Sequence, residues 1–243
     1  MRQRLLLILS LLVCGSVFAQ QTPPENRRVF VACPVVKDSE TLPCWLADYE
    51  GQTYYLGQQG RTSSVFYPPQ LKHKVLVEGT VNEAIQHCGG LFLEDVVISV
   101  LPELSLECNT ILPATPGVKP PAPLPKAVRP HFEDSTRHFS IYMDFDGDFL
   151  TYHRSGIIDE ADRIAKLNGL NKVKISISKG AVLLSNGEVM IEKDITLKRR
   201  ADKLKTIFEQ LGYQAEVHIA SEAIKPDGLA DHRNRRIDIE LKN

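Results

Sequence analysis

Residues 230–243 read ADHRNRRIDIELKN, and this stretch decides how the chain ends. From Ile237 to Leu241 apolar and acidic residues alternate, which predicts a strand with one buried and one wet face. Just before it, residues 232–236 hold three arginines, a histidine and an asparagine, although the formal net charge of the chain is only −1. Because no global basic field exists, we interpret this cluster as a local feature and not as a nucleic-acid site.

The segments that precede this strand alternate between the two periodicities of secondary structure. Apolar residues recur at every second position in the expected strands and at helical spacing in the expected helices. Gly169 and Gly212 provide the stop signals of the two helices. The order predicts an α/β sandwich, a mixed sheet with helices on one side. The expected strands are 138–150, 172–180, 215–221 and 235–241, and the expected helices are 155–169 and 197–213.

The earlier part of the chain has a different composition. Short runs rich in Val, Tyr, Phe and Leu are separated by Gly, Pro and Asp/Ser clusters, which predicts an all-β fold, a small barrel or sandwich of OB-like type. Seven prolines between Pro113 and Pro130 predict a semi-rigid extended linker. We therefore expect two domains, 25–112 and 131–243, joined by the linker 113–130.

Residues 1–19 combine a basic start, an apolar stretch and small residues before Gln20, which predicts a secretory signal peptide. Its removal takes away two arginines and changes the net charge to −3. No later stretch is long enough to predict a transmembrane span. The mature protein is therefore expected in the periplasm, where it could be peripheral to the outer membrane or the cell wall.

The remaining cysteines are expected to form two disulfides, because their number is even in an exported chain. Cys33 and Cys44 flank a good turn sequence, so a bond between them, with Cys88–Cys108 as the second, is plausible. All three pairings stay open.

Trp45, Tyr49, Tyr54 and Tyr55 allow two interpretations. They could form a stacking surface for a glycan or a protein partner, or they could pack inside the β fold, which aromatic residues in strands commonly do.

Residues 138–243 resemble the OmpA-like C-terminal domain, a periplasmic module that binds peptidoglycan non-covalently. The resemblance is carried by IYMDFDGDFL at 141–150, LKRRADKLKTIFEQLGY at 197–213 and NRRIDIEL at 234–241. It does not extend to residues 25–112. It implies that the ligand is the carboxylate and ammonium end of diaminopimelate in the peptidoglycan stem peptide.

The resemblance also implies the site residues. Arg200, directly before Ala201 and expected in the first turn of its helix, matches the arginine that holds the ligand carboxylate. Arg235 and Arg236 resemble the family's paired arginines before its last strand; Arg235, with Asn234 before it, is the one assigned to the ligand side. The family's loop aspartate has no counterpart, because Leu183 and Ser185 stand where it is expected. Glu188 or Asp194 could replace it.

The sequence thus predicts a non-catalytic periplasmic protein that binds peptidoglycan. The alternative is an adaptor in which the OmpA-like fold has lost this ligand and serves protein–protein interaction. We find no catalytic constellation for a hydrolase, no cofactor motif and no spacing for a metal site. In DFDGDFL, at 144–150, glycine and glutamate do not stand where an EF-hand requires them.

Overall fold

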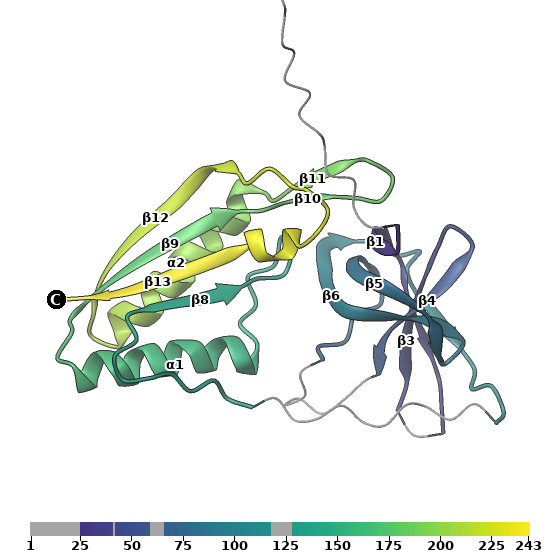
Figure 1. The fold of residues 1–243 in the computed structure, drawn as a ribbon, viewed down its shortest axis with the longest axis horizontal. Helices are drawn as coiled ribbons and strands as arrows, with labels where there is room; N and C mark the ends of the chain where they lie inside the picture. Colours follow the sequence, from purple (N-terminus) through teal and green to yellow (C-terminus); the bar gives the residue numbers. More distant parts are fainter. Residues whose placement is uncertain (1–24, 41, 59–65, 118–127) are drawn as a thin grey trace, which may run out of the picture.

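The structure is a computed structural model that describes residues 25–40, 42–58, 66–117 and 128–243. The expected signal peptide lies outside the described residues, as does much of the proline-rich segment. Figure 1 shows a β-rich N-terminal region, residues 25–112, beside a C-terminal α/β region, residues 131–243. None of the helices in the described residues has the length and apolar content needed to cross a bilayer.

The N-terminal region is all-β, as predicted, but it is not a closed barrel. Its strands form one seven-stranded sheet in the order β1-β5-β6-β4-β3-β2-β7. The end strands β1 and β7 each pair with a single neighbour, so the sheet stays open. The strands are β1 (Arg27–Ala32), β2 (Pro34–Lys37), β3 (Cys44–Tyr49), β4 (Gln52–Gln58), β5 (His73–His87), β6 (Gly90–Leu104) and β7 (Thr110–Leu112).

Two disulfides staple this sheet, which confirms their expected number. The pairs are Cys33–Cys108 and Cys44–Cys88, so the suggested bond between Cys33 and Cys44 is wrong. The turn between those two cysteines joins β2 and β3, which pair in antiparallel fashion, but each thiol has a distant partner instead. Each bond therefore closes a long loop and restricts the unfolded chain more than a hairpin bond would.

The aromatic residues of β3 and β4 serve packing. Trp45, Tyr54 and Tyr55 are buried, and burial raises the pKa of Tyr55 to about 12. Tyr49 is half-buried and stacks on Phe30 with ring centroids 4.6 Å apart. The structure thus agrees with the packing interpretation, because Trp45 and Tyr54 belong to the apolar cluster inside the sheet and Tyr55 belongs to a second cluster with Cys44 and Cys88.

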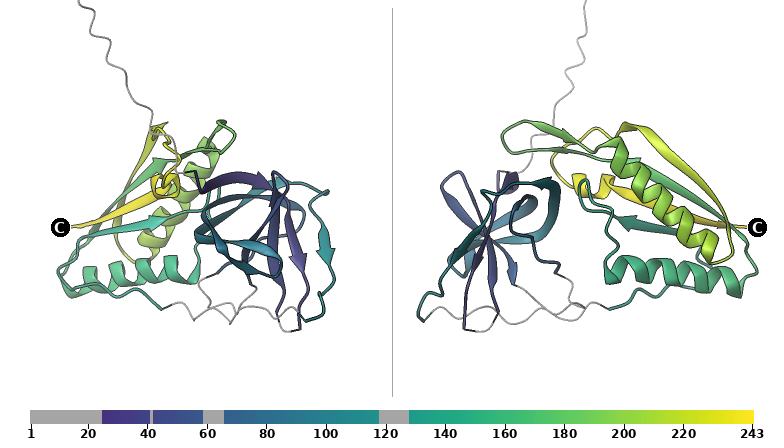
Figure 2. Two further views of the ribbon diagram at one scale, coloured as in Figure 1. Left: turned by 45° about the vertical axis from the view of Figure 1, so that its right-hand side comes forward. Right: turned by 180° about the vertical axis from the view of Figure 1, so that it is seen from behind.

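The C-terminal region is the predicted α/β sandwich. Its four-stranded sheet has the order β12-β9-β13-β8, in which β12 runs parallel to β9 while β13 runs antiparallel to β9 and β8. Both helices cover one face (Figure 2). The elements are β8 (His138–Tyr142), α1 (Tyr152–Leu167), β9 (Lys172–Lys179), β10 (Ala181–Leu183), β11 (Val189–Ile191), α2 (Asp194–Gln210), β12 (Gln214–Ala223), the 3-10 helix η1 (Asp231–Asn234) and β13 (Arg236–Lys242).

Local chemistry explains the helix boundaries. The side chain of Thr151 caps α1 by accepting a hydrogen bond from the backbone N–H of Arg154. The apolar faces of α1 and α2 pack on the inward residues of the sheet, where each buried Leu, Ile or Phe contributes about 1.5–3 kcal/mol. α2 begins three residues before the predicted start, so Arg200 lies in its second turn and not in its first.

A buried contact joins the two regions. The expected strand 138–150 ends at Tyr142, and Phe145 leaves the sheet to join an apolar cluster with residues of both regions. The backbone N–H of Phe145 donates to Ser99 Oγ at 2.8 Å. The other buried members of this cluster are Val29, Leu76, Leu101, Val182 and Leu184.

Backbone hydrogen bonds extend this contact along β1. Ser185 follows β10, and its N–H donates to the carbonyl of Val29 at 2.8 Å while its Oγ accepts from the N–H of Val29 at 2.9 Å. The hairpin of the C-terminal region therefore borders the free edge of the N-terminal sheet. The two regions share a dry, hydrogen-bonded junction and not only a linker.

We expect the junction to survive cleavage of the linker. A protease should cut first within residues 113–130, and the two fragments should still elute together in size-exclusion chromatography under non-denaturing conditions. Elution as two separate species would contradict the junction. Fragments that separate only after addition of urea would agree with it.

Candidate functional site

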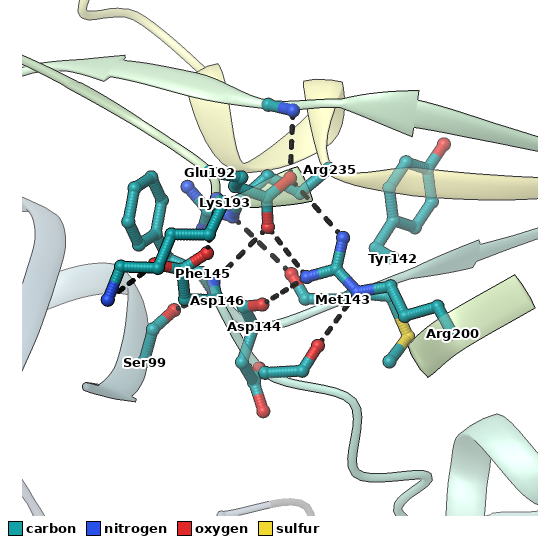
Figure 3. Close-up of polar contacts among 12 residues, drawn as sticks. Ser99, Tyr142, Met143, Asp144, Phe145, Asp146, Glu192, Lys193, Arg200 and Arg235 are labelled. Carbon is teal, nitrogen blue, oxygen red and sulfur yellow. Dashed lines mark hydrogen bonds and ion pairs between the residues drawn. The ribbon is translucent and has the colours of Figure 1, made fainter. Parts of the chain in front are cut away.

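The structure buries the two arginines that the sequence assigns to the ligand. Arg200 and Arg235 are 1% and 0% exposed, which makes them the largest fully buried side chains of the described residues. Arg200 extends from α2, while Arg235 lies directly before β13. Figure 3 shows both side chains converging on the segment after β8. A buried guanidinium requires an anionic partner, so their partners define what this site can do.

The other predicted site residues lie elsewhere. The carboxylate of Asp194 is largely exposed at the start of α2 and accepts a 2.6 Å hydrogen bond from Lys179 Nζ. Glu188 is exposed in the β10–β11 hairpin and contacts Asn186. Asn234 is half-buried in η1. Neither acid is the partner of Arg200, so the two replacements considered for the missing aspartate are not brought to this arginine.

Arg200 forms an ion pair with Glu192, whose side chain is also 0% exposed. Arg200 Nη2 lies 2.6 Å from Glu192 Oε1, and Nη1 lies 3.3 Å from Oε2, so the contact is bidentate. Two backbone carbonyls accept from the same guanidinium. Nε donates to the carbonyl of Gly147 and Nη2 to that of Asp144, both at 2.8 Å. Through these two carbonyls, Arg200 fixes the position of the loop that follows β8.

Glu192 is held by backbone amides in addition to the guanidinium. Its Oε2 accepts from the N–H of Gly180 at 2.8 Å and its Oε1 from the N–H of Asp146 at 3.2 Å. An arginine and two backbone amides are the donors that a site for a free carboxylate would present. Here the carboxylate comes from the chain itself.

Arg235 completes a second buried pair, this one between the two regions. Its Nη2 donates to Glu78 Oε2 at 2.5 Å, and the side chains are 0% and 1% exposed. Glu78 lies in the middle of β5, and the Arg235 guanidinium also lies over the ring of Phe145, 5.8 Å from its centroid. The pair thus links the start of β13 to the N-terminal sheet.

Gly180 separates the two arginines. A Cβ placed on Gly180 would lie 2.3 Å from Arg235 Cγ and 2.9 Å from Glu192 Oε2. Neither neighbour can withdraw without breaking a buried ion pair. Glycine is therefore required at position 180, because a larger residue would collide with members of both buried ion pairs.

Two further acids, Asp146 and Asp144, lie next to this cluster. Burial, assisted by the charge of Glu192, raises the pKa of Asp146 above its ordinary value. Its Oδ1 accepts a 2.8 Å bond from the N–H of Lys193, the residue that precedes α2. The side chain of Lys193 also bonds Glu103 of β6, which adds a contact between the regions. The carboxylate of Asp144 is occupied by a bidentate ion pair with Arg154.

Sequence reasoning missed Glu192 and Glu78, and each carried a detectable signal. Glu192 is a lone acid after the apolar run VMI and directly before Lys193, close to the start of α2. Glu78 interrupts the apolar strand KVLVEGTV, which predicts a buried charge that must be compensated.

The described residues hold no cluster of three or more His, Cys, Asp or Glu side chains that could bind a metal ion. Comparisons with protein-family models, with curated proteins and with solved structures find no match to this chain.

We predict that Glu192→Ala lowers the free energy of unfolding by about 3–5 kcal/mol, because it leaves the Arg200 guanidinium buried without its anion. Urea unfolding followed by circular dichroism measures the change. Glu188→Ala is the matched control in the same hairpin, and we expect a change within about 0.5 kcal/mol since its carboxylate is exposed. Equal effects of the two substitutions would contradict the buried pair.

We also predict a pH dependence centred on His232 of η1. Burial lowers the pKa of its imidazole; Glu78 opposes this shift, and Arg235, Arg27 and Arg233 add to it. Because the unfolded chain protonates near its ordinary pKa of about 6.5, it binds the proton more readily than the folded chain. Stability should therefore be complete above that pKa and decline as the pH falls through the lower folded value.

Urea unfolding of wild type and His232→Gln at pH 7.5 and pH 5 isolates this contribution. The free-energy difference between wild type and variant should shift against wild type at the lower pH. Parallel pH profiles of the two proteins would show that His232 does not titrate in this way.

Proposed function

We propose that this protein is a non-catalytic extracytoplasmic interaction protein, in which an OmpA-like α/β fold no longer takes the stem peptide and acts as an adaptor for protein partners. The observation that carries the proposal is the closure of Arg200. Every nitrogen of its guanidinium donates to Glu192 or to the backbone carbonyls of Gly147 and Asp144. A ligand carboxylate would need those same donors.

The loop that lacks the family's aspartate supports the same proposal. At the two positions where the acid is expected, Leu183 and Ser185 have other contacts. The N–H of Leu183 donates to the buried carboxylate of Asp231, and Ser185 bonds Val29 of the N-terminal region. A surface that would face the stem peptide is thus used to hold the two regions together, and neither of the two positions offers an acid to the ligand ammonium.

Arg235 supports it as well, since its guanidinium forms an ion pair with Glu78. To release Arg235 toward an external ligand would strand a buried carboxylate, which costs several kcal/mol. The two disulfides support an oxidising compartment. Peptidoglycan binding through Arg200 is the competing prediction from the sequence, and the following experiment decides between the two.

We predict that the wild-type protein stays in the supernatant when it is sedimented with purified peptidoglycan sacculi. Arg200→Ala should also stay there and should be less stable to urea than wild type, because Glu192 then lacks its cation. Arg199→Ala is the matched control, since Arg199 is its exposed neighbour on α2 and should change neither property. Sedimentation of wild type and of Arg199→Ala, but not of Arg200→Ala, would overturn the proposal and restore Arg200 as a ligand residue.

A further inference from the structure

We propose that the cleft between β6 and β8 binds an extended, uncharged peptide segment of a partner protein, which adds as a strand to the free edge of β8. This inference rests on the proposed adaptor function, because it names the kind of partner and the surface that takes it. The cleft shares Asp144 with the cluster around Arg200, but its lining includes neither Arg200 nor Glu192.

The residues that line the cleft belong to β6 on one side and to β8 and α1 on the other. Figure 1 shows that these elements face each other across the two regions. Its volume is about 600 Å³, which is within the range of small-ligand sites, and such sites are common between domains. One wall is Val96–Ile98 of β6, and the other includes Ser140 and Tyr142 of β8 and Ile157 of α1. A ligand in the cleft would therefore contact both regions.

β8 offers an unpaired backbone edge to this cleft. It is an end strand of its sheet and pairs only with β13. The N–H of Met143 donates to Arg235, and the carbonyl of Arg137 accepts from Leu241, which places the odd-numbered residues in hydrogen-bonded pairs with β13. Since the pattern alternates, the N–H and C=O of Ser140 and Tyr142 point to the opposite side.

One of these outward groups is already used, because the carbonyl of Tyr142 accepts a 2.7 Å bond from Arg154 Nε. The N–H and C=O of Ser140 form no hydrogen bond with any other residue that the structure describes. The donor and the acceptor of one residue, facing the same way, are what an added strand pairs with. Main-chain pairing would give such a segment its affinity without a specific side chain.

The charges of the walls decide what the side chains of the segment must be. Asp144 and Arg154 neutralise each other in a bidentate pair at 2.9 Å and 2.5 Å. Much of the remaining wall is apolar or aromatic, with Phe132, Ile98 and Ile157 inside the hollow. An unpaired charge placed there would lose hydration without gaining a partner. The segment is therefore uncharged, with an apolar side chain directed into the hollow.

The test uses the full chain and a phage-displayed library of random dodecapeptides. We expect enrichment of uncharged peptides rich in β-branched and apolar residues. Ser140→Pro should weaken the binding of a selected peptide at least tenfold, because proline removes the outward N–H while the hydrogen bonds between β8 and β13 stay. Ser140→Ala is the matched control: it also loses the hydroxyl contact with Asp238, but it keeps the N–H and should bind as wild type does.

Tyr142→Lys keeps the test decisive if the proline variant does not fold. Tyr142 lines the cleft and is 47% exposed, so a charge there should abolish peptide binding while the fold stays intact. The absence of enriched peptides, or equal affinity of wild type and Tyr142→Lys, would overturn the proposal. So would a self-association that Ser140→Pro dissolves, since the edge would then take a second copy of the chain. Sedimentation with sacculi tests the adaptor proposal separately from peptide binding in the cleft, because none of these substitutions alters Arg200.

Discussion

A buried guanidinium must be matched by an anion, and this requirement organises the centre of the molecule. Arg200 and Arg235 approach the same loop after β8 from different elements, and each obtains its own glutamate, Glu192 or Glu78. The two pairs are separated by Gly180, which has no side chain because there is no room for one. Charge compensation thus positions the loop after β8, the hairpin and the start of β13 in one rigid arrangement.

The same pairs decide how the two regions relate. Glu78 belongs to the N-terminal sheet, and Arg235 directly precedes β13 of the C-terminal sheet. The apolar cluster that contains Phe145 also takes residues from both regions. A linker rich in proline suggests independent bodies joined by a spacer, but the buried contacts give the chain a shared core. A surface formed by both regions can therefore act as one binding site, because the buried contacts fix the position of one region relative to the other.

Much of the C-terminal fold was predictable, because alternation in RIDIEL and helical spacing in the α2 segment follow directly from burial of one face. The order of elements was predictable for the same reason, and the two disulfides were predictable from the even number of cysteines after residue 19. The open shape of the N-terminal sheet was not, since strand order depends on contacts between distant residues. The pairing of Cys33 with Cys108 was missed on the same ground. At the site, sequence identified Arg200 and Arg235 but not their partners. Glu78 lies 157 residues from Arg235, and nothing local to either residue names the other.

That separation has a consequence for the order in which the chain can fold. Arg235 is synthesised near the end of this sequence, whereas Glu78 precedes it by 157 residues. Until Arg235 is present, the carboxylate of Glu78 in β5 lacks its cation, and burying it against the C-terminal region would be costly. The buried contact between the two regions therefore cannot be completed before residue 235 is present, and a chain that stops short of it leaves Glu78 without its guanidinium.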